Sequence, residues 1–255
     1  MRKLLAVVVV PFLIVTFAVN AHAQQTLRIA AAADLQPLLP AILAQFSAET
    51  GIRTSASYKS SAVLATSIIN GAPFDLFLAA DLSFPQRVIA AGLAEESTPV
   101  TYAQGTLVLW TRNDTPFRKL SIDSLRDAEL KTLAIANPQH APYGRAAQNA
   151  LEHLGLYGAL KPKLVIAENI AQTAQYADSG NAQLGMISLT AALTPRMRAD
   201  GHYTLVPRHA YLPILQGAVV IKNSRNAHAA ERFLNFLESP SISRELEARG
   251  LAPAH

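Results

Sequence analysis

From residue 26 onward, short apolar or alternating runs are separated by segments in which apolar residues recur every three or four positions. The short runs predict strands, and the longer spacing predicts amphipathic helices. In the first third of the chain a glycine follows each predicted helix, as is common at helix C-termini. The predicted strands are 26–33, 52–58 and 75–79, and the predicted helices are 38–50, 62–70 and 84–91. This repeated order predicts a parallel sheet with helices on both faces.

The same alternation resumes after a polar, turn-rich segment at 112–118, which indicates a second lobe. One more strand and two helices follow this second run, and we expect them to pack on the first lobe. Lobe 1 is therefore predicted to contain residues 24–104 and 217–255, and lobe 2 residues 105–216. The later predicted elements are strands 106–111, 133–136, 164–167, 184–188 and 215–221, and helices 124–128, 144–154, 170–178, 227–238 and 241–248.

Two Gln-Gly pairs mark the places where the chain is expected to pass between the lobes. They are Gln104 with Gly105 and Gln216 with Gly217. Glycine tolerates the backbone rotation that a hinge requires, so both pairs are candidate hinges. The alternative is that each glycine only begins a strand, and the pattern leaves both interpretations open.

The N-terminus has the three parts of a secretory signal peptide. Two basic residues precede an apolar run at 4–19, and the small-x-small sequence AHA follows it. Residues 1–23 are therefore predicted to be cleaved, so that the mature protein begins at Gln24 and is periplasmic. The alternative is an uncleaved N-terminal anchor. No cysteine follows the apolar run, which excludes a lipoprotein anchor.

Charge and cysteine content exclude several classes of function. The 255 residues include 22 Lys or Arg and 18 Asp or Glu, and two of the basic residues lie in the predicted signal peptide. The mature chain is thus close to neutral and has no basic run, which argues against a nucleic-acid partner. The chain has no cysteine, so disulfides, thiol catalysis and thiolate metal sites are excluded.

Four predicted strands run into helices through short junctions of small or polar residues, with the sequences AAAADL, SSAV, APYGR and ENIA. In a parallel sheet such junctions share the edge where ligands bind. Each helix N-terminus offers unpaired N–H groups and a partial positive charge, and several of them together would bind an anion without Lys or Arg. The alternative is that Asp34, Ser60, Ser61 and Asn169 are ordinary N-caps.

The sequence gives less support for an enzyme than for an anion-binding site. The sequence has no G-x-S-x-G, no H-E-x-x-H and no P-loop, and its histidines lack the spacing of helical metal ligands. Asp34, Asp75 and Asp81 lie near predicted strand ends, which would allow a carboxylate pair. A secreted hydrolase that uses Asp34 or Ser61 therefore stays an alternative, as does a sensor or partner module without a role in transport.

Five segments carry a resemblance to a known family: AAAADL, SSAVL, NGAPFDLFLAAD, NPQHAPYGRAA and AENIAQTAQ. In their order, and over nearly the whole mature chain, they resemble the periplasmic molybdate-binding proteins of ABC importers. For the fold, the resemblance implies the second common topology of periplasmic binding proteins (type II). In that fold each of two lobes has a mostly parallel sheet flanked by helices, and the ligand cleft lies between the lobes.

For function, the resemblance implies a monomeric binding protein, not an enzyme, that delivers molybdate, and tungstate as well, to the membrane permease of an importer. The oxyanion would be held between the lobes by hydrogen bonds alone, without a cofactor. The implied contacts are Ala33, Asp34 and Ser61, with Ser60 beside it, in lobe 1, and Tyr143 and the backbone N–H of Ile170 in lobe 2. Of these, Asp34, Ser61, Tyr143 and Ile170 would hold the molybdate.

Two residues depart from the family pattern and affect the choice of ligand. Many relatives have Ser or Asn where this chain has Asp34, and some have a Tyr that reaches the ligand where this chain has Ser188. A carboxylate repels an oxyanion unless the two share a proton. Asp34 would therefore either turn away as a helix cap or accept a hydrogen bond from a protonated oxyanion such as hydrogen phosphate. Phosphate, sulfate and chromate are thus alternative ligands.

Overall fold

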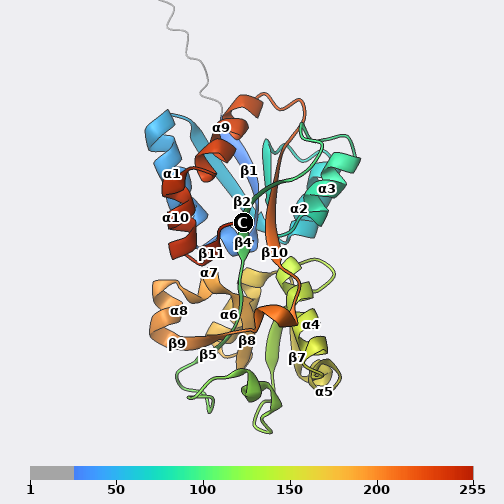
Figure 1. Ribbon diagram of the computed structural model, residues 1–255, viewed down its shortest axis with the longest axis vertical. Coiled ribbons are helices and arrows are strands. Elements are labelled where there is room, and N and C mark those ends of the chain that lie inside the picture. Colours follow the sequence, from blue (N-terminus) through green and yellow to red (C-terminus); the bar gives the residue numbers. More distant parts are fainter. Residues whose placement is uncertain (1–25, 255) are drawn as a thin grey trace, which may run out of the picture.

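The computed structural model describes residues 26–254, so the predicted signal peptide (residues 1–23) and the start of the mature chain at Gln24 lie outside the described residues. Between residues 26 and 254 the chain forms two lobes, one above the other in Figure 1, and each lobe is a sheet with helices against it. No helix in this range has both the length and the apolar character needed to cross a membrane. The predicted α/β class with two lobes is confirmed.

The upper lobe, lobe 1, has a six-stranded sheet. Its middle strands pair in parallel, β2 with β1 and β1 with β3, whereas β10, β4 and β11 pair antiparallel. In spatial order the strands are β11 (Leu251–Ala252), β4 (Val100–Gly105), β10 (Ile214–Val220), β3 (Leu76–Ala79), β1 (Thr26–Ala32) and β2 (Arg53–Lys59).

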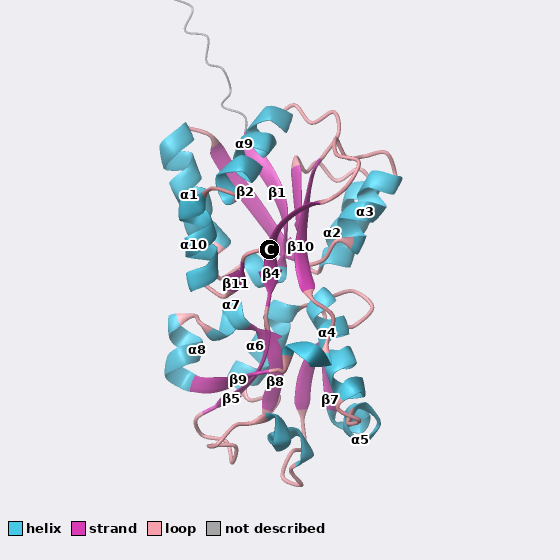
Figure 2. Cartoon of the chain, in the orientation of Figure 1, coloured by secondary structure: helices cyan, strands magenta, loops and turns pink. Residues whose placement is uncertain are grey.

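Helices cover both faces of this sheet, as Figure 2 shows for the upper lobe. One face packs against α1 (Leu39–Thr50), α9 (Ala227–Leu237) and α10 (Pro240–Ala248). The other face packs against α2 (Ser61–Ile69) and α3 (Ser83–Ala90). Successive residues of a strand point to opposite faces, so strands covered on both sides are apolar throughout. The fully buried LFLA of β3 is an example.

The lower lobe, lobe 2, has a five-stranded sheet that is parallel on one side and antiparallel on the other. In spatial order the strands are β7 (Leu164–Ala167), β6 (Leu133–Ala136), β8 (Leu184–Ser188), β5 (Leu107–Arg112) and β9 (Gly201–Leu205). One core cluster joins this sheet to α4 (Pro142–His153) and α5 (Tyr157–Leu160), and the other joins it to α6 (Ile170–Ser179), α7 (Leu189–Ala192) and α8 (Pro195–Asp200).

The structure differs from the sequence-based expectation in the direction of the strands, in one helix and in three short strands. The sheets are mixed and not mostly parallel, because only strands linked by a crossover helix run parallel, whereas the strands near the lobe crossings return antiparallel. The predicted helix 124–128 is instead a 3-10 turn, η2 (Ile122–Arg126). The strands β4, β9 and β11 escaped prediction, since each is short or polar at alternate positions.

The lobes are joined by β4 and β10, which pair side by side in lobe 1 (Figure 1). Ile214, the first residue of β10, pairs with Gly105, the last residue of β4, whereas the Ile214 side chain packs in the core cluster of lobe 2. The division into residues 24–104 with 217–255 and residues 105–216 stays a prediction. A Cβ at Gly105 would overlap the Tyr143 hydroxyl, and one at Gly217 would lie 2.9 Å from the carbonyl oxygen of Asp81. The neighbouring atoms therefore leave room only for a glycine at each of these two positions. A hinge rotation at Gly105 or Gly217 stays a prediction.

Candidate functional site

Lobe 1 brings three polar side chains to the end of its sheet that faces lobe 2. Asp34 lies in the 3-10 turn η1 (Ala33–Leu35), directly after β1. Ser60 and Ser61 directly follow β2, whose last residue pairs with the last residue of β1, so the two junctions are neighbours. The Ser61 hydroxyl accepts a hydrogen bond of 3.1 Å from the N–H of Ala80, which follows β3. The register of three parallel strands thus gathers these residues.

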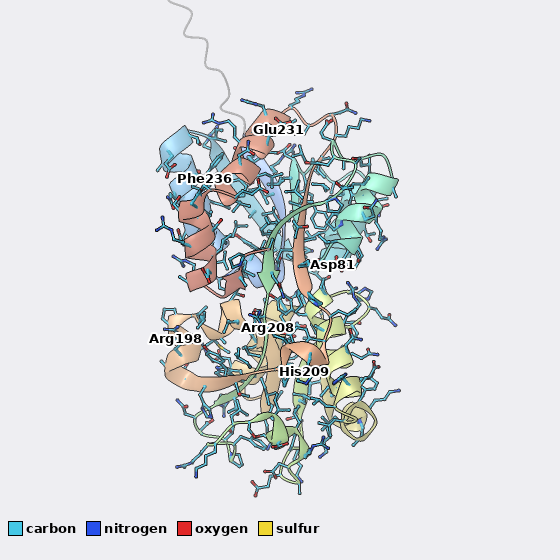
Figure 3. All side chains as sticks on the ribbon, in the orientation of Figure 1. Asp81, Arg198, Arg208, His209, Glu231 and Phe236 are labelled. Atoms are coloured by element: carbon cyan, nitrogen blue, oxygen red, sulfur yellow. The ribbon has the colours of Figure 1, made fainter. Side chains whose placement is uncertain are left out.

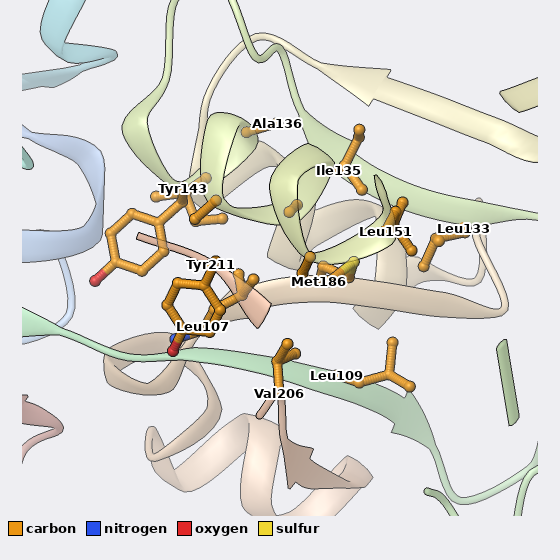
Figure 4. Packing of buried hydrophobic residues seen from close by; sticks show 14 of the residues in the cluster. Leu107, Leu109, Leu133, Ile135, Ala136, Tyr143, Leu151, Met186, Val206 and Tyr211 are labelled. Carbon is orange, nitrogen blue, oxygen red and sulfur yellow. The ribbon is translucent and has the colours of Figure 1, made fainter. Parts of the chain in front are cut away.

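Lobe 2 brings Tyr143 to the same place. Pro142 and Tyr143 are the first two residues of α4, and Gly144 is the third. A Cβ at Gly144 would overlap the Ala136 carbonyl, so the glycine lets the helix begin directly against the end of β6. In Figure 4 the Tyr143 ring lies at the edge of the apolar cluster, and its hydroxyl points away from the aliphatic side chains. The Tyr-Gly pair thus aims a hydroxyl out of the lobe 2 core toward lobe 1.

The N-terminus of α6 is the second contribution of lobe 2. Asn169 is the N-cap, and its side chain accepts a 3.0 Å hydrogen bond from the N–H of Gln172. The N–H groups of Ile170 and Ala171, the first two helical residues, have no partner within the helix. The Ile170 side chain is buried in the lobe 2 core, so only its backbone can serve a ligand. Ala33, Asn169 and Ser188 line a groove of about 660 Å³ between the lobes.

Three buried polar atoms in residues 26–254 have no hydrogen-bond partner: Asp34 Oδ1, Ser60 Oγ and the Tyr143 hydroxyl. The three side chains are 1%, 3% and 1% exposed. Burying a polar group without a partner costs about 1–3 kcal/mol, so native proteins rarely retain one without a functional reason. All three belong to the residues predicted from the sequence, and they come from both lobes. They define the point where a small polar ligand would supply the missing hydrogen bonds.

Asp34 is held by a chain of hydrogen bonds within lobe 1. The Tyr102 hydroxyl donates to Gln216 Oε1 at 3.1 Å, and Gln216 Nε2 donates to Asp34 Oδ2 at 2.7 Å. Burial raises the pKa of Asp34 to about 6, against the opposing effects of Gln216 and of the nearby Tyr143 hydroxyl. Burial, and then the Asp34 charge, raises the pKa of Tyr143 well above its usual value, so this phenol stays a donor. The proposed role of Asp34 as a helix cap is wrong, because its side chain caps no helix.

Sequence reasoning missed Gln216 and Tyr102 as supports of the site. Gln216 is fully buried, whereas the sequence pattern identifies it only as the neighbour of a candidate hinge glycine. A single Gln inside the otherwise apolar strand ILQGAVV was the available signal, since a buried amide needs polar partners.

Ser188 is the N-cap of α7 and accepts a 3.3 Å hydrogen bond from the N–H of Ala191. The Thr190 hydroxyl lies 2.9 Å from Ser188 Oγ and donates a 2.8 Å hydrogen bond to the backbone carbonyl of Asp34. This last hydrogen bond connects α7 of lobe 2 to η1 of lobe 1.

The predicted carboxylate pair does not form. Asp75 lies at the opposite end of β3, where Arg28, Ser224 and Asn226 donate to it. Asp81 instead forms an ion pair with Arg145 of lobe 2. Across the described residues, no three His, Asp or Glu side chains gather where they could hold a metal ion. The site therefore offers hydrogen bonds, and not metal coordination.

The arrangement also lacks the usual parts of a serine hydrolase. A nucleophilic serine needs a neighbouring base to accept its proton. The Ser60 hydroxyl has no side-chain or backbone partner in the part of the chain that the structure describes. The hydrogen-bond partner of the Ser61 hydroxyl is a backbone N–H and not a base. The serines are therefore suited to hydrogen bonding with a ligand.

Direct contacts join the lobes around this point. Arg145 pairs with Asp81, and its guanidinium lies 5.2 Å from the centre of the Phe84 ring. Figure 3 marks Asp81 at the edge of lobe 1 that faces lobe 2. The N–H of Ala62, at the start of α2, donates to the His140 carbonyl of lobe 2 at 3.2 Å. Both contacts thus involve residues close in sequence to site residues, Arg145 to Tyr143 and Ala62 to Ser61.

Comparison with known proteins gives consistent matches along the chain. Residues 27–252 match the family model described as bacterial extracellular solute-binding protein. The molybdate-binding protein ModA of Rhodobacter capsulatus is 36% identical over 83% of this chain and 82% of its own. That of Azotobacter vinelandii is 34% identical over 88% of each chain. A solved periplasmic molybdate-binding protein of Azotobacter vinelandii superposes with a TM-score of 0.83 at 31% identity, over 89% of this chain and 98% of the other.

Proposed function

Because the chain belongs to the family of bacterial extracellular solute-binding proteins, we propose that it captures molybdate and delivers it to an ABC importer. The observation that carries the proposal is the meeting of three unpartnered buried polar atoms from both lobes in a chain whose relatives are molybdate-binding proteins. We further propose that it works as a monomer in the periplasm, without catalysis.

The chemistry of the site favours a small oxyanion. Ser60, Ser61 and Tyr143 each have a hydroxyl hydrogen that can be donated. The N-termini of α2 and α6 add backbone N–H groups and a partial positive charge. The oxygens of molybdate accept hydrogen bonds and donate none, which suits this set of donors. We propose that Ser60, Ser61, Tyr143 and the N–H of Ile170 hold the ligand, and that Ala33 contributes only backbone.

Binding and closure of the lobes are coupled in this proposal. The ligand would touch lobe 1 through the serines and lobe 2 through Tyr143 and Ile170. A ligand that contacts both lobes favours the state in which they are together, because only that state makes all of its hydrogen bonds. The closed form would then be what the importer recognises. Tungstate has the same shape and charge as molybdate and should bind as well.

The test is a calorimetric titration of residues 24–255 with molybdate, tungstate, sulfate and phosphate, each at about pH 6.5. We expect molybdate and tungstate to bind with similar affinity and sulfate to bind far more weakly. Preferential binding of sulfate or phosphate would contradict the proposed ligand. As a control for the site, Ser60→Ala should weaken molybdate binding, whereas Ser179→Ala, at the exposed end of α6, should leave it unchanged.

A further inference from the structure

The three unpartnered buried atoms are of two chemical kinds. Ser60 Oγ and the Tyr143 hydroxyl are donors, whereas Asp34 Oδ1 is an acceptor when the carboxyl group is ionised. The oxygens of a fully ionised molybdate are acceptors only, so they satisfy both hydroxyls but not Asp34 Oδ1. The Tyr143 hydroxyl lies near enough to Asp34 to influence its pKa through hydrogen bonding, but its single hydrogen cannot serve Asp34 and the ligand at once. Two acceptors can form a hydrogen bond only when a proton lies between them. The site as built is therefore one proton short for a fully ionised ligand.

The hydrogen bonds around Asp34 decide where such a proton would lie. Oδ2 already accepts from Gln216 Nε2, and the Tyr102 hydroxyl fixes the orientation of that amide by donating to its oxygen. A proton on Oδ2 would face the N–H of Gln216, which repels it. Oδ1 is left as the protonation site, and it is the oxygen without a partner.

The charges around Asp34 also indicate that a dianionic ligand needs a proton beside this carboxylate. Among the buried polar and charged residues within 26–254, none is Lys, Arg or His. The groups that face Asp34 are Gln216 from β10, Tyr102 from β4, Tyr143 from α4 and Thr190 from α7, with Tyr211 behind Tyr143. Gln216 and Thr190 carry no charge, and burial keeps Tyr102 and Tyr143 uncharged by raising their pKa well above the usual value. A dianion beside an ionised Asp34 would thus face a third negative charge with no buried cation to offset it.

We propose that each oxyanion binds together with one proton, shared between Asp34 Oδ1 and a ligand oxygen, so that Asp34 selects ligands by their basicity. This inference rests on the proposed function. For each dianion bound, one proton is transferred from a buffer acid to the site: the bond between that hydrogen and the buffer acid breaks, and an O–H bond forms at Asp34 Oδ1 or at the ligand oxygen that shares the proton. Sulfate is a much weaker base than molybdate and would share the proton poorly. The pKa of Asp34, raised to about 6 by burial, is consistent with proton uptake near neutral pH.

The experiment is calorimetric titration of the wild-type protein with molybdate between about pH 6.5 and pH 8.5, in buffers that differ in ionisation enthalpy. The buffer dependence of the heat counts the protons taken up. We expect close to one proton per molybdate at the upper end of this range. The affinity should fall about tenfold per pH unit, because the free protein must first be protonated.

The matched variant is Asp34→Asn, which keeps the shape of the side chain and replaces the shared proton by a permanent N–H donor. At about pH 8 it should bind molybdate about a hundredfold more tightly than wild type, without proton uptake or pH dependence. Its preference for molybdate over sulfate should be smaller. The control Asp114→Asn removes an exposed carboxylate from a turn in lobe 2 and should behave as wild type.

The outcomes separate this inference from the proposed function. Tight molybdate binding by the wild type with no proton uptake and no pH dependence would overturn the shared proton and leave the function intact. This wild-type result decides the matter even if Asp34→Asn does not fold. No binding of molybdate at any pH would overturn the proposed ligand, and hydrogen phosphate then becomes the probe. Phosphate affinity that falls at least tenfold in Asp34→Asn would support the shared proton, and equal affinity would overturn it.

Discussion

Two buried aspartates at opposite ends of the lobe 1 sheet have opposite surroundings. Asp75, at the far end, accepts hydrogen bonds from the Arg28 backbone, from Ser224 and from Asn226 at 2.7–3.1 Å. Burial alone would raise its pKa, but the Arg28 guanidinium, 3.3 Å from Oδ2, and then these donors hold the pKa below the usual value. Asp34, at the end facing lobe 2, has one donor within hydrogen-bond distance of Oδ2 and none within that distance of Oδ1, and its other polar neighbour is the uncharged Tyr143 hydroxyl. Both residues are only 1% exposed, although Asp75 lies closer to the surface, beside the partly exposed Arg28, so solvent exposure by itself does not distinguish a structural carboxylate from a functional one.

What distinguishes the two ends is whether the protein completes its own hydrogen bonds. The far end completes them and connects β1, β3 and the segment before α9. The end facing lobe 2 leaves polar atoms without partners and draws one of them, the Tyr143 hydroxyl, from the other lobe. Complete networks contribute stability, and incomplete ones contribute affinity for whatever completes them. The predictions below test this division from the largest expected effect to the smallest.

The largest effect is expected for Gly105→Ala, which alters the space around Tyr143. The added methyl group would overlap the Tyr143 hydroxyl, so the lobes could not approach as they do. We expect molybdate binding to weaken by about 3–5 kcal/mol, from the lost hydrogen bond and the overpacking together. Gly158→Ala is the matched control, because a Cβ there meets nothing within 4 Å. Calorimetric titration of both variants measures the difference, and equal affinities would contradict the placement of Tyr143.

At the far end, Asp75→Ala should reduce stability and leave affinity unchanged. The change leaves Ser224, Asn226 and the partly exposed Arg28 without their acceptor, and we expect a loss of about 2–4 kcal/mol in the free energy of unfolding. Urea denaturation of the ligand-free protein measures this loss. Molybdate affinity of the folded variant should match the wild type, and a clear fall in affinity would argue against the division between the two ends.

Asp34 should make the ligand-free protein less stable as the pH rises. Its pKa is raised in the folded state, so its contribution to stability is complete below its unfolded value near 3.8 and is lost as the pH rises through about 6. The loss amounts to about 3 kcal/mol by pH 7. Asp34→Asn should lack this slope, which thermal unfolding from pH 4 to pH 7 would reveal. Asp75, whose pKa is lowered, contributes in the opposite sense and loses its contribution as the pH falls below 3.8.

Tyr143→Phe removes one hydroxyl from the site and keeps the ring in the lobe 2 core. We expect molybdate binding to weaken by about 1.5–3 kcal/mol, as for the loss of one hydrogen bond to a charged group, with little change in stability. Ser61→Ala should have a similar effect on affinity. Tyr157→Phe, with its tyrosine in α5 away from the site, is the control for the chemical change. An unchanged affinity in Tyr143→Phe would remove this residue from the site.

The smallest effect is expected for the contact that joins the lobes beside the site. Arg145→Gln removes the partly exposed ion pair with Asp81 and the contact with Phe84. Solvent screens such pairs, so we expect affinity to fall by only about 0.5–1.5 kcal/mol. A double-mutant cycle with Asp81→Asn isolates the pair. A coupling energy near zero would mean that ligand contacts alone hold the lobes together.

Much of the fold was predictable because it depends on local patterns. The apolar runs located β1, β3, β6 and β8, and the helical spacing located the helices next to them, within a few residues. The direction of the strands was not predictable in the same way. Whether β10 runs parallel or antiparallel to β3 depends on the path of the chain between the lobes, and that path leaves no periodic signal in the strand itself.

The sequence by itself indicated two lobes and located the strand-to-helix junctions, because strand ends and helix starts depend on neighbouring residues. The six candidate residues at those junctions came from the family resemblance, and their contact with a ligand stays a prediction. Only the tertiary structure decided how those residues are used. It left Ser60 without a partner and gave Ser61 a backbone donor, and it moved Asp75 away from the site. It also placed Gln216, 182 residues along the chain, against Asp34. Hydrogen bonds between distant segments depend on strand register and on closure of the lobes, which no local sequence pattern specifies.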